Sequence, residues 1–463
     1  MGTNDNVKIE LPRDVSFIIS ELEGKGYEAY AVGGCIRDSL LGKTPDDWDI
    51  TTSASPEEVK AVFQRTIDTG IKHGTVTVRL HGRSYEVTTF RIDGDYSDGR
   101  HPDNVEFVKN LDEDLKRRDF TINAMAYSEK AGIIDLFNGR EDLEKGIIRC
   151  VGVSRERFSE DALRMMRAVR FAARFGFSIE ESTYEAIKDL APTLSKVSAE
   201  RIRVEFEKTL ISDHPEFARE FYLLGLSKVF LPEWDACLEC PQNTVHHLYT
   251  VGEHTIRVMQ NVSNDHIMRL AAFFHDIGKP VSRKTDKKGH DHFVGHPVLG
   301  AAMTVNIMKR LKYDNATIDK VRVLVERHDD RPALTIENIR HEISGMGKEI
   351  YPLLLELRHA DVMGQSDFHR EEKLNRVSES RRYFDEICSE NDALSVRDLA
   401  IKGRDLIEMG IDKGPSMGII FDELLAIVLK NPELNERDSL ISLTKSIINV
   451  IKHGEPFVYE GCK

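Results

Sequence analysis

Two carboxylates one residue apart, Asp47 and Asp49, follow the glycine pair Gly33-Gly34 and the basic residue Arg37. If the segment around them is a strand, both carboxylates point to one face, because side chains alternate along a strand. Two hard oxygen ligands suit Mg²⁺, whose remaining ligands are then waters and phosphate oxygens. A glycine pair lets backbone amides approach phosphates closely, and a nearby arginine can neutralise a triphosphate. This group therefore predicts a site for nucleotidyl transfer.

A third carboxylate, Glu86, lies in the strand-like run 85–90. Three carboxylates suit a two-metal mechanism, in which one metal activates a sugar hydroxyl and the other holds the leaving pyrophosphate. The protein then mainly positions groups and stabilises charge. The structural alternatives are a cross-strand ion pair for Glu86 and a cap or an ion pair with Arg37 for Asp38.

In residues 157–171, Asp161 is followed by arginines at steps of three. Asp161 and Arg164 are expected to be neighbours on a helix, and Arg167 and Arg170 continue the same face. A salt-bridge ladder within the helix is the structural alternative. One acid facing several arginines would leave most guanidiniums unpaired, which favours a role in binding an anion or a base.

A carboxylate beside a guanidinium can recognise the edge of a nucleobase. The carboxylate accepts from an exocyclic amino group, and the guanidinium donates to a ring nitrogen or a carbonyl. Cytosine and adenine present an amino group where uracil and guanine present a carbonyl. The pair Asp161 and Arg164 therefore predicts a protein template for CTP and ATP. Arg118, which precedes an apolar run, is a candidate for the same pocket, whereas Arg117 is expected to be solvated.

The surrounding pattern shows how these groups are positioned. Residues 27–151 mix strands with helices, and from Arg155 onward the pattern is helical. One helix is expected over 56–63 with Ser55 as its N-cap. The others are one that follows Asp161 and ends before Gly176, and one over 198–210. Strands are expected at 30–32, 75–80 and 85–90, and a linker with two free thiols, Cys237 and Cys240, between Pro232 and Pro241.

The composition predicts a soluble protein of several domains. The chain has 463 residues, of which 40% are hydrophobic and 31% charged. No apolar run approaches the roughly 18 residues of a membrane span, and no signal peptide is evident, so a cytoplasmic protein without a membrane partner is expected. Six scattered cysteines argue against a disulfide framework. The net charge of −14 disfavours nucleic-acid binding by the whole surface, but the arginines of 155–174 form a local basic region.

Four motifs resemble, in order, those of the class II tRNA nucleotidyltransferases, the CCA-adding enzymes of the polymerase-β-like superfamily. They are Gly33-Gly34-x-x-Arg37-Asp38, Asp47-x-Asp49, the segment 117–124 and the segment 160–171. The resemblance implies transfer of C, C and A from CTP and ATP to tRNA, held at its 3′ acceptor end and its elbow. It implies Asp47 and Asp49 as catalytic Mg²⁺ ligands with Glu86 as the third carboxylate. The nucleotide pocket would be formed by Gly34, Arg37, Arg118, Asp161, Arg164, Arg167 and Arg170.

Other activities remain open beside CCA addition. The same head occurs in bacterial poly(A) polymerases, although residues 66–76 are similar to the CCA-adding form. Some relatives add only CC or only A, and the loop 93–102 looks like the full-length loop of enzymes that add both bases. A signalling regulator that modifies a protein partner is a further class, which the short C-terminal module and the Asp161–Arg164 base reader disfavour.

A histidine-rich region follows the arginine-rich helix. His275 and Asp276 interrupt the apolar run 267–277, and buried polar side chains of this kind need partners, which a metal supplies. The region resembles an HD domain, a metal-dependent phosphohydrolase fold, whose motif order matches His254, His275, Asp276 and Asp361. Histidines at 292, 296 and 328 are candidates for a second metal. The resemblance implies a divalent transition metal and hydrolysis at RNA 3′ ends, the alternative being an inactive scaffold.

Together these features predict an α+β protein. A polymerase-β-like nucleotidyltransferase head with a mixed sheet precedes an all-α neck, an HD-type body and a helical tail. The expected domains are 1–150, 151–240, 241–375 and 376–463. The sequence leaves the oligomeric state open.

Overall fold

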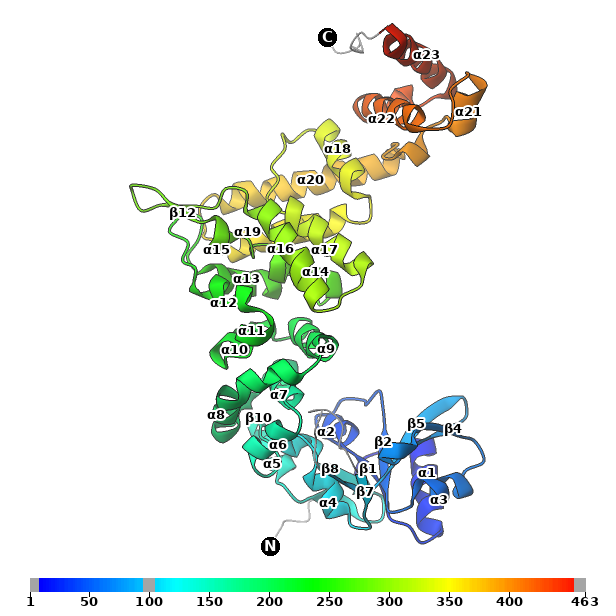
Figure 1. The fold of residues 1–463 in the computed structure, drawn as a ribbon, viewed down its shortest axis with the longest axis vertical. Coiled ribbons are helices and arrows are strands. Elements are labelled where there is room, and N and C mark those ends of the chain that lie inside the picture. The colour runs from blue at the N-terminus through cyan, green and yellow to red at the C-terminus, as the bar shows by residue number, and fades with distance from the viewer. Residues whose placement is uncertain (1–7, 95–104, 454–463) are drawn as a thin grey trace. The chain divides into compact units, whose positions relative to one another are not determined.

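The computed structural model describes residues 8–94 and 105–453, and the loop expected at 93–102 lies mostly outside them. The chain forms two compact units (Figure 1). One comprises Met1–Ala236 with Ile307–Tyr313, and the other Cys237–Asn306 with Asp314–Lys463. The first unit contains a large mixed sheet, and the described part of the second is helical apart from one short hairpin.

A seven-stranded sheet forms the centre of the first unit, in the order β3-β4-β5-β2-β1-β8-β9. Strands β2 and β5 pair in parallel, whereas the other neighbouring strands are antiparallel, so the sheet is mixed as predicted. The strands of the sheet are β1 (Ala29–Val32), β2 (Asp49–Thr52), β3 (Thr66–Gly70), β4 (Thr75–Leu80), β5 (Arg83–Thr89), β8 (Met125–Ser128) and β9 (Gly132–Asp135).

The turn between β4 and β5 fixes the register of the strand that carries Glu86. His81 and Gly82 join the two strands, and both have positive φ angles, 46° and 80°. A two-residue turn of this conformation matches the twist of the flanking strands. The resulting register places Glu86 opposite Thr77. The cross-strand ion pair considered for Glu86 is therefore not formed with its direct neighbour.

Two helices cover one face of this sheet, α1 (Arg13–Gly24) and α3 (Pro56–Val62). Ile18 and Leu22 of α1 are fully buried in the same hydrophobic cluster as Val87 of β5. Their spacing of four residues puts both on one side of the helix. Ser55 caps α3 as predicted, in a reciprocal capping box with Glu58.

The remaining elements of the first unit are mostly helical, and those from α5 onward follow the sheet in the chain. The short strands are β6 (Arg91–Asp93), β7 (Val105–Phe107), β10 (Ile147–Ile148) and β11 (Ser178–Ile179). The helices are α2 (Gly34–Leu40), α4 (Leu111–Lys116), α5 (Gly139–Lys145), α6 (Ser154–Glu160), α7 (Leu163–Phe175), α8 (Glu181–Leu190), α9 (Ala199–Leu210), α10 (Ala218–Leu223) and α11 (Ser227–Phe230).

The expected linker after Pro232 is a packed helix, α12 (Pro232–Glu239). Trp234 within it is fully buried and donates its indole N–H to the carbonyl of Ala218 at 3.0 Å. Cys237 and Cys240 are both buried free thiols. Pro232 does not break the structure because a proline is tolerated at the first position of a helix. The linker interpretation was wrong, whereas the assignment of two free thiols was correct.

The second unit is built from helices. They are α13 (Val251–Gln260), α14 (His266–Phe274), α15 (Lys279–Ser282), α16 (His296–Arg310), α17 (Asn315–Arg327), α18 (Ile336–Met346), α19 (Tyr351–Gly364), α20 (Arg370–Glu390), α21 (Gly403–Glu408), α22 (Pro415–Lys430) and α23 (Arg437–His453). A two-stranded hairpin of β12 (Lys284–Thr285) and β13 (Asp291–His292) interrupts them. Helix α16 runs across the boundary between the two units.

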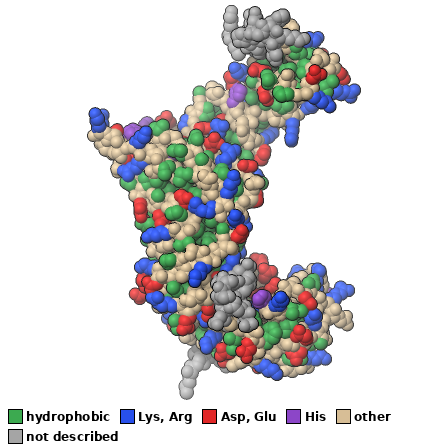
Figure 2. Space-filling model, viewed as in Figure 1, with side chains coloured by type: hydrophobic (Ala, Val, Ile, Leu, Met, Phe, Trp, Pro, Cys, Tyr) green, Lys and Arg blue, Asp and Glu red, His purple; other side chains and the backbone are tan. Residues whose placement is uncertain are grey.

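The C-terminal helices enclose a core of their own. Leu406 of α21, Leu424 of α22 and Leu440 of α23 are fully buried in one hydrophobic cluster. No helix of the described residues is long and apolar enough to cross a membrane. On the face drawn in Figure 2, acidic and basic side chains are interspersed across both units.

Candidate active sites

The carboxylates of the first unit lie on, or just before, two neighbouring parallel strands, β2 and β5. Asp49 is the first residue of β2, and Glu86 lies in β5. Ile50 pairs with Val87, so the residues immediately before this pair, Asp49 and Glu86, face the same side of the sheet. Asp47 precedes the strand rather than lying in it, because β2 begins at Asp49. The expectation of both aspartates on one strand was therefore only half correct.

The charges of these carboxylates act on one another. Asp49 remains accessible to solvent, yet partial desolvation raises its pKa, with Arg118 acting in the opposite direction and Asp47 adding to the rise. Burial also raises the pKa of Glu86, and the negative charges of Asp49 and then Asp47 raise it further. Mutual repulsion of this kind is relieved by a bound cation. The three oxygen donors therefore fit a hard divalent metal.

The glycine pair approaches the site closely. Gly33 has a φ of +85°, and a Cβ at this position would lie 2.9 Å from Nη1 of Arg118. A side chain here would meet both backbone strain and a clash, so only glycine lets Arg118 reach the start of α2. Arg118 Nη2 is 3.4 Å from Oδ2 of the buried Asp114. Arg117, expected to be solvated, instead pairs with Asp114 at 2.7 Å.

Arg37 is buried and its guanidinium is fixed by several partners. Its Nε and Nη2 donate to Asp38 at 2.9 and 2.8 Å, so the ion pair weighed for Asp38 is formed. Nη1 donates to the side-chain oxygen of Asn123. The guanidinium also lies 4.9 Å from the ring centre of Phe175. Arg37 thus ties α2 to α7.

The arginines of α7 are paired with acids from other elements. Arg164 bonds Glu160, and Arg174 bonds Asp38 at 3.1 Å. Arg167 donates to Asp119 at 2.6 and 2.8 Å. The remaining guanidinium, that of Arg170, pairs with Glu205 of α9. The expectation that most of these guanidiniums are unpaired was wrong, because all but Arg164 find their acids in segments distant in the sequence.

Asp161 lies between two helices. Helix α6 ends at Glu160 and α7 begins at Leu163, so Asp161 and Arg164 do not share one continuous helix. The Asp161 carboxylate accepts from the backbone N–H of Leu163 at 3.0 Å and from Arg201 of α9 at 2.7 and 3.3 Å. The backbone still bends so that both residues stay adjacent, with Arg164 N–H bonded to the Asp161 carbonyl at 3.0 Å.

Asp119 is a central residue that the sequence did not single out. Its carboxylate accepts from Arg167, from the Asn123 amide at 3.0 Å and from the backbone of Phe120 at 2.8 Å. It therefore joins the loop after α4 to α7. The sequence did contain a signal for this role, because Asp119 and Asn123 are four residues apart within the motif 117–124.

Acid should destabilise the first unit through Asp119. Burial alone would raise the pKa of this carboxyl, but Arg167 and Asn123 outweigh burial and hold the pKa well below its ordinary value. The resulting stabilisation is present above the unfolded pKa of about 3.9 and is lost as the pH falls toward the folded pKa. Between pH 5 and pH 3 we expect the wild-type melting temperature to fall about 2–4 °C more than that of Asp119→Asn. Circular dichroism measures this, and equal falls in the two proteins would contradict it.

The histidines and aspartates of the second unit converge in two groups that share Asp276. In the first, His254 Nε2 lies 3.2 Å from His275 Nε2 and 3.0 Å from an oxygen of Asp361. Both histidines are fully buried. The structure therefore brings together all four residues expected for an HD site, His254, His275, Asp276 and Asp361.

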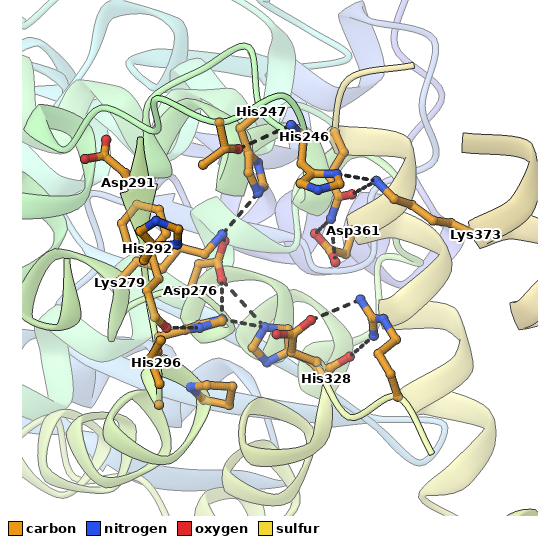
Figure 3. A pocket seen from close by; sticks show the side chains of 18 residues that line it. His246, His247, Asp276, Lys279, Asp291, His292, His296, His328, Asp361 and Lys373 are labelled. Carbon is orange, nitrogen blue, oxygen red and sulfur yellow. Dashed lines mark hydrogen bonds and ion pairs between the residues drawn. The ribbon is translucent and has the colours of Figure 1, made fainter. Parts of the chain in front are cut away.

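The second group contains Asp276, His296 and His328. The Nε2 atoms of the two histidines are 3.3 Å apart, and each lies within 3.6 Å of Oδ1 of Asp276 (Figure 3). His292 is not part of it, because its ring is exposed and pairs with Asp286 at 3.2 Å. Of the three histidines considered for a second metal, the structure assembles two.

The orientation of these four imidazoles fits metal ligation. Each Nδ1 lies 2.7–3.1 Å from a backbone carbonyl, those of Gly364, Ala272, Phe293 and Val325. A neutral ring that donates from Nδ1 presents a lone pair at Nε2. Two such lone pairs facing each other at 3.2 or 3.3 Å repel unless a cation lies between or beside them. The donor set, imidazole nitrogen with carboxylate oxygen, suits a transition metal.

Among the described residues, only these two groups have three ligand atoms within 4.8 Å of one another. The carboxylates of the first unit are more widely spaced. That wider spacing leaves room for substrate oxygens to complete the coordination, whereas the second unit holds a compact protein cage.

Known families match along most of the chain. Residues 29–149 match the poly A polymerase head domain, 176–238 the probable RNA and SrmB-binding site of polymerase A, and 244–363 the HD domain. The fold and both sites thus define a metal-dependent nucleotidyltransferase that carries an HD domain.

Individual relatives show which family of nucleotidyltransferases the chain belongs to. The CCA-adding enzyme of Leuconostoc mesenteroides is 37% identical over 442 residues, which cover 94% of this chain and 96% of that protein. That of Lactiplantibacillus plantarum is 60% identical over 198 residues, 43% of this chain and 49% of the relative. A crystal structure of the Bacillus stearothermophilus CCA-adding enzyme in complex with CTP has a TM-score of 0.70 at 32% identity, covering 95% and 98% of the two chains. The chain belongs to the CCA-adding enzymes, and the poly(A) polymerase alternative is not favoured.

Proposed function

We propose that this chain adds C, C and A to the 3′ end of tRNA, using CTP and ATP. The observation that carries the proposal is the bend between α6 and α7, which holds Asp161 and Arg164 next to each other, with the Arg164 N–H bonded to the Asp161 carbonyl at 3.0 Å. A related protein was solved in complex with CTP, which supports CTP as a substrate of this chain. The predicted cytoplasmic location agrees with this substrate.

The predicted site residues of the nucleotidyltransferase head have different roles in the reaction. Asp47, Asp49 and Glu86 would hold Mg²⁺, which lowers the pKa of the attacking 3′-hydroxyl and stabilises charge on the triphosphate. The Gly33-Gly34 backbone and Arg118 border the start of α2, where a triphosphate is favoured. Asp161 accepts from the amino group of cytosine or adenine, and Arg164 donates to the ring. Arg37, Arg167 and Arg170 hold the elements that form the pocket.

The activity is tested with tRNA that lacks its 3′ CCA. CTP, ATP, both together, UTP and GTP are supplied separately, and product length is read on a sequencing gel. We expect three additions with CTP and ATP together and almost none with UTP or GTP. Long tracts of A on any RNA would contradict the proposal, and addition of CTP alone would identify an enzyme that adds only CC.

A basic pocket of about 310 Å³ in the first unit supports an RNA acceptor. Lys43, Arg170, Arg174 and Lys208 line it. The two arginines are paired with Glu205 and Asp38. Among the described residues, neither Lys43 nor Lys208 has an ion pair with a carboxylate. Asp213 lines the same pocket, so two ammonium groups face one carboxylate there. The remaining positive charge fits a phosphate of the RNA backbone.

Charge reversal at this pocket should weaken the binding of RNA but not the binding of the nucleotide. For Lys208→Glu we expect the KM for tRNA to rise about five- to tenfold, with the KM for CTP unchanged, and the salt slope of RNA binding to fall by about 1. Steady-state kinetics and titrations at several salt concentrations measure this. Lys130→Glu, an exposed lysine in the turn after β8, is the matched control. Equal effects of the two variants would contradict a specific role for the pocket.

We further propose that the HD domain is a metal-dependent phosphohydrolase acting on RNA 3′ ends. The pocket above its two histidine groups measures about 500 Å³ (Figure 3). Lys279 lies beside Asp276 at 2.6 Å, and Lys373 and Arg331 line the same pocket. Cations beside a metal site favour a phosphate ester as substrate.

The wall of this pocket also orients a predicted metal ligand. The Gln365 amide donates to both oxygens of Asp361 at 3.0 Å, and Lys373 donates to the Gln365 oxygen at 2.8 Å. Partners of this kind fix the plane of a ligating carboxylate. Hydrolysis here would remove a phosphate that blocks the 3′-hydroxyl needed by the head.

A further inference from the structure

The ion pair between Asp161 and Arg201 connects the predicted base reader to a second helix. Arg201 belongs to the first turn of α9, and its Nη1 and Nη2 bond separate oxygens of Asp161 at 3.3 and 2.7 Å. Both side chains are largely shielded, with 21% and 14% of their surfaces exposed. The pair is therefore bidentate and protected from solvent, which gives it a fixed geometry.

The location of Arg201 is unfavourable for the helix alone. The N-terminal turn of a helix carries partial positive charge and favours acidic side chains. Arg201 stands three residues after the N-cap Ser198. A cation in this turn is stabilised by its ion pair with Asp161, so the position serves the contact between α9 and the α6–α7 bend.

We propose that Arg201 is a positioning residue that sets base selectivity by holding the Asp161 carboxylate in one plane. This inference rests on the proposed function of Asp161 as a base reader. Each carboxylate oxygen has two lone pairs. Arg201 occupies one on each oxygen, and the Leu163 N–H occupies a further one on Oδ1. The remaining acceptor direction on Oδ2 is then defined in space.

A carboxylate held in one orientation can distinguish an amino group from a carbonyl on the base, whereas a carboxylate that rotates freely cannot. An amino group of cytosine or adenine can donate to the remaining lone pair of Oδ2. A carbonyl of uracil or guanine at the same place meets a carboxylate oxygen that cannot turn away, and the two oxygens repel each other. Without Arg201 the carboxylate can rotate about its side-chain torsion and accommodate either group.

Lysine cannot replace this arginine. An ammonium group supplies a compact positive charge without the planar fork that matches a carboxylate. Arg201→Lys therefore keeps the charge near Asp161 but not the plane of the carboxylate. The conservative variant separates the electrostatic contribution from the geometric one.

The experiment compares selectivity among four nucleotides. For Arg201→Gln and Arg201→Lys, kcat/KM is measured with CTP, ATP, UTP and GTP on tRNA lacking its 3′ end. We expect the preference for CTP over UTP, and for ATP over GTP, to fall about ten- to hundredfold in Arg201→Gln. In Arg201→Lys, we expect catalytic rates closer to wild type with selectivity still reduced.

A matched arginine of the same helix serves as the control. Arg203 bonds the carbonyl of Lys312 and lies over the ring of Tyr313. Arg203→Gln removes a guanidinium from α9 without touching Asp161, so selectivity should stay at the wild-type level. Melting temperatures of all variants show whether each one is folded.

The outcomes separate the inference from the function on which it rests. If both Arg201 variants lower kcat/KM equally for all four nucleotides, Arg201 only supports the fold and the inference is overturned. Asp161→Asn is measured in parallel. If Asp161→Asn keeps wild-type selectivity, the base-reading role itself is wrong; if it loses selectivity while Arg201→Gln keeps it, only the inference fails.

Discussion

Replacing Asp49 with asparagine should abolish nucleotide addition while the chain stays folded. Asp49 opens β2 and faces the same side of the sheet as Glu86. An amide keeps the shape of the side chain but removes the charge that would hold Mg²⁺. Metal stabilisation of the triphosphate contributes several kcal/mol, so kcat should fall about 10³-fold or more.

The thermal stability of the metal-free protein should rise slightly on this substitution. Burial and then repulsion among the carboxylates raise the pKa values of Asp49 and Glu86, so removing the charge of Asp49 relieves part of this cost. We expect the melting temperature without metal to be unchanged or higher. The added stabilisation that Mg²⁺ and CTP together give the wild type should be lost.

The control for this experiment is Asp46→Asn. Asp46 is exposed and lies three residues before Asp49, but it does not contribute to the pKa shifts of Asp49 or Glu86. Its substitution should leave nucleotide addition near the wild-type rate. Full activity of Asp49→Asn at saturating CTP would overturn the assignment of the carboxylate site.

Replacing Asp276 with alanine should remove metal from the HD domain and abolish hydrolysis there. Asp276 belongs to both groups of ligands, with Oδ2 toward His254 and His275 and Oδ1 toward the other two histidines. Loss of this one carboxylate affects both groups. We expect hydrolysis of an RNA ending in a 2′,3′-cyclic phosphate to fall about 10³-fold or more, because a metal held by Asp276 would activate the attacking water.

The metal content of the purified protein provides a readout independent of hydrolysis. Elemental analysis of the wild type after incubation with a divalent transition metal should show bound metal that Asp276→Ala lacks. Nucleotide addition by the head should persist in this variant. His292→Ala is the matched control, because His292 is exposed and outside both groups.

Two results would contradict the proposed phosphohydrolase activity of the HD domain. Undiminished hydrolysis of the cyclic phosphate by Asp276→Ala would place that activity elsewhere. Metal binding by the wild type without any hydrolysis would favour the alternative of a structural scaffold.

Local patterns in the sequence predicted several elements accurately. Strand β4 was expected at 75–80, which is its observed extent, and Ser55 caps α3 as expected. These features depend on residues a few positions apart, so the sequence contains all the information they need. The same applies to the end of α7 at Gly176, whose positive φ of 68° suits glycine.

Pairing between distant residues was not predictable in this way. The sequence placed the arginines of α7 on one face, but most of their acids lie elsewhere: Asp119 is 48 residues from Arg167, and Asp38 is 136 residues from Arg174. Which acid meets which arginine depends on how α7 packs against α9 and the loop after α4. Periodicity along a single helix carries no information on that packing.

In the candidate sites, too, some features were predictable from the sequence and others depended on the tertiary structure. The types and spacing of Asp47, Asp49, His275 and Asp276 indicated metal chemistry from the sequence alone, because few other roles require such residues together. Only the folded chain selected His296 and His328, and excluded His292, because three histidines of similar appearance differ in burial and orientation. The sequence by itself determined the chemistry and the family, since both depend on residue type and order. The tertiary structure decided the partners of each charge, since these depend on which distant segments pack together.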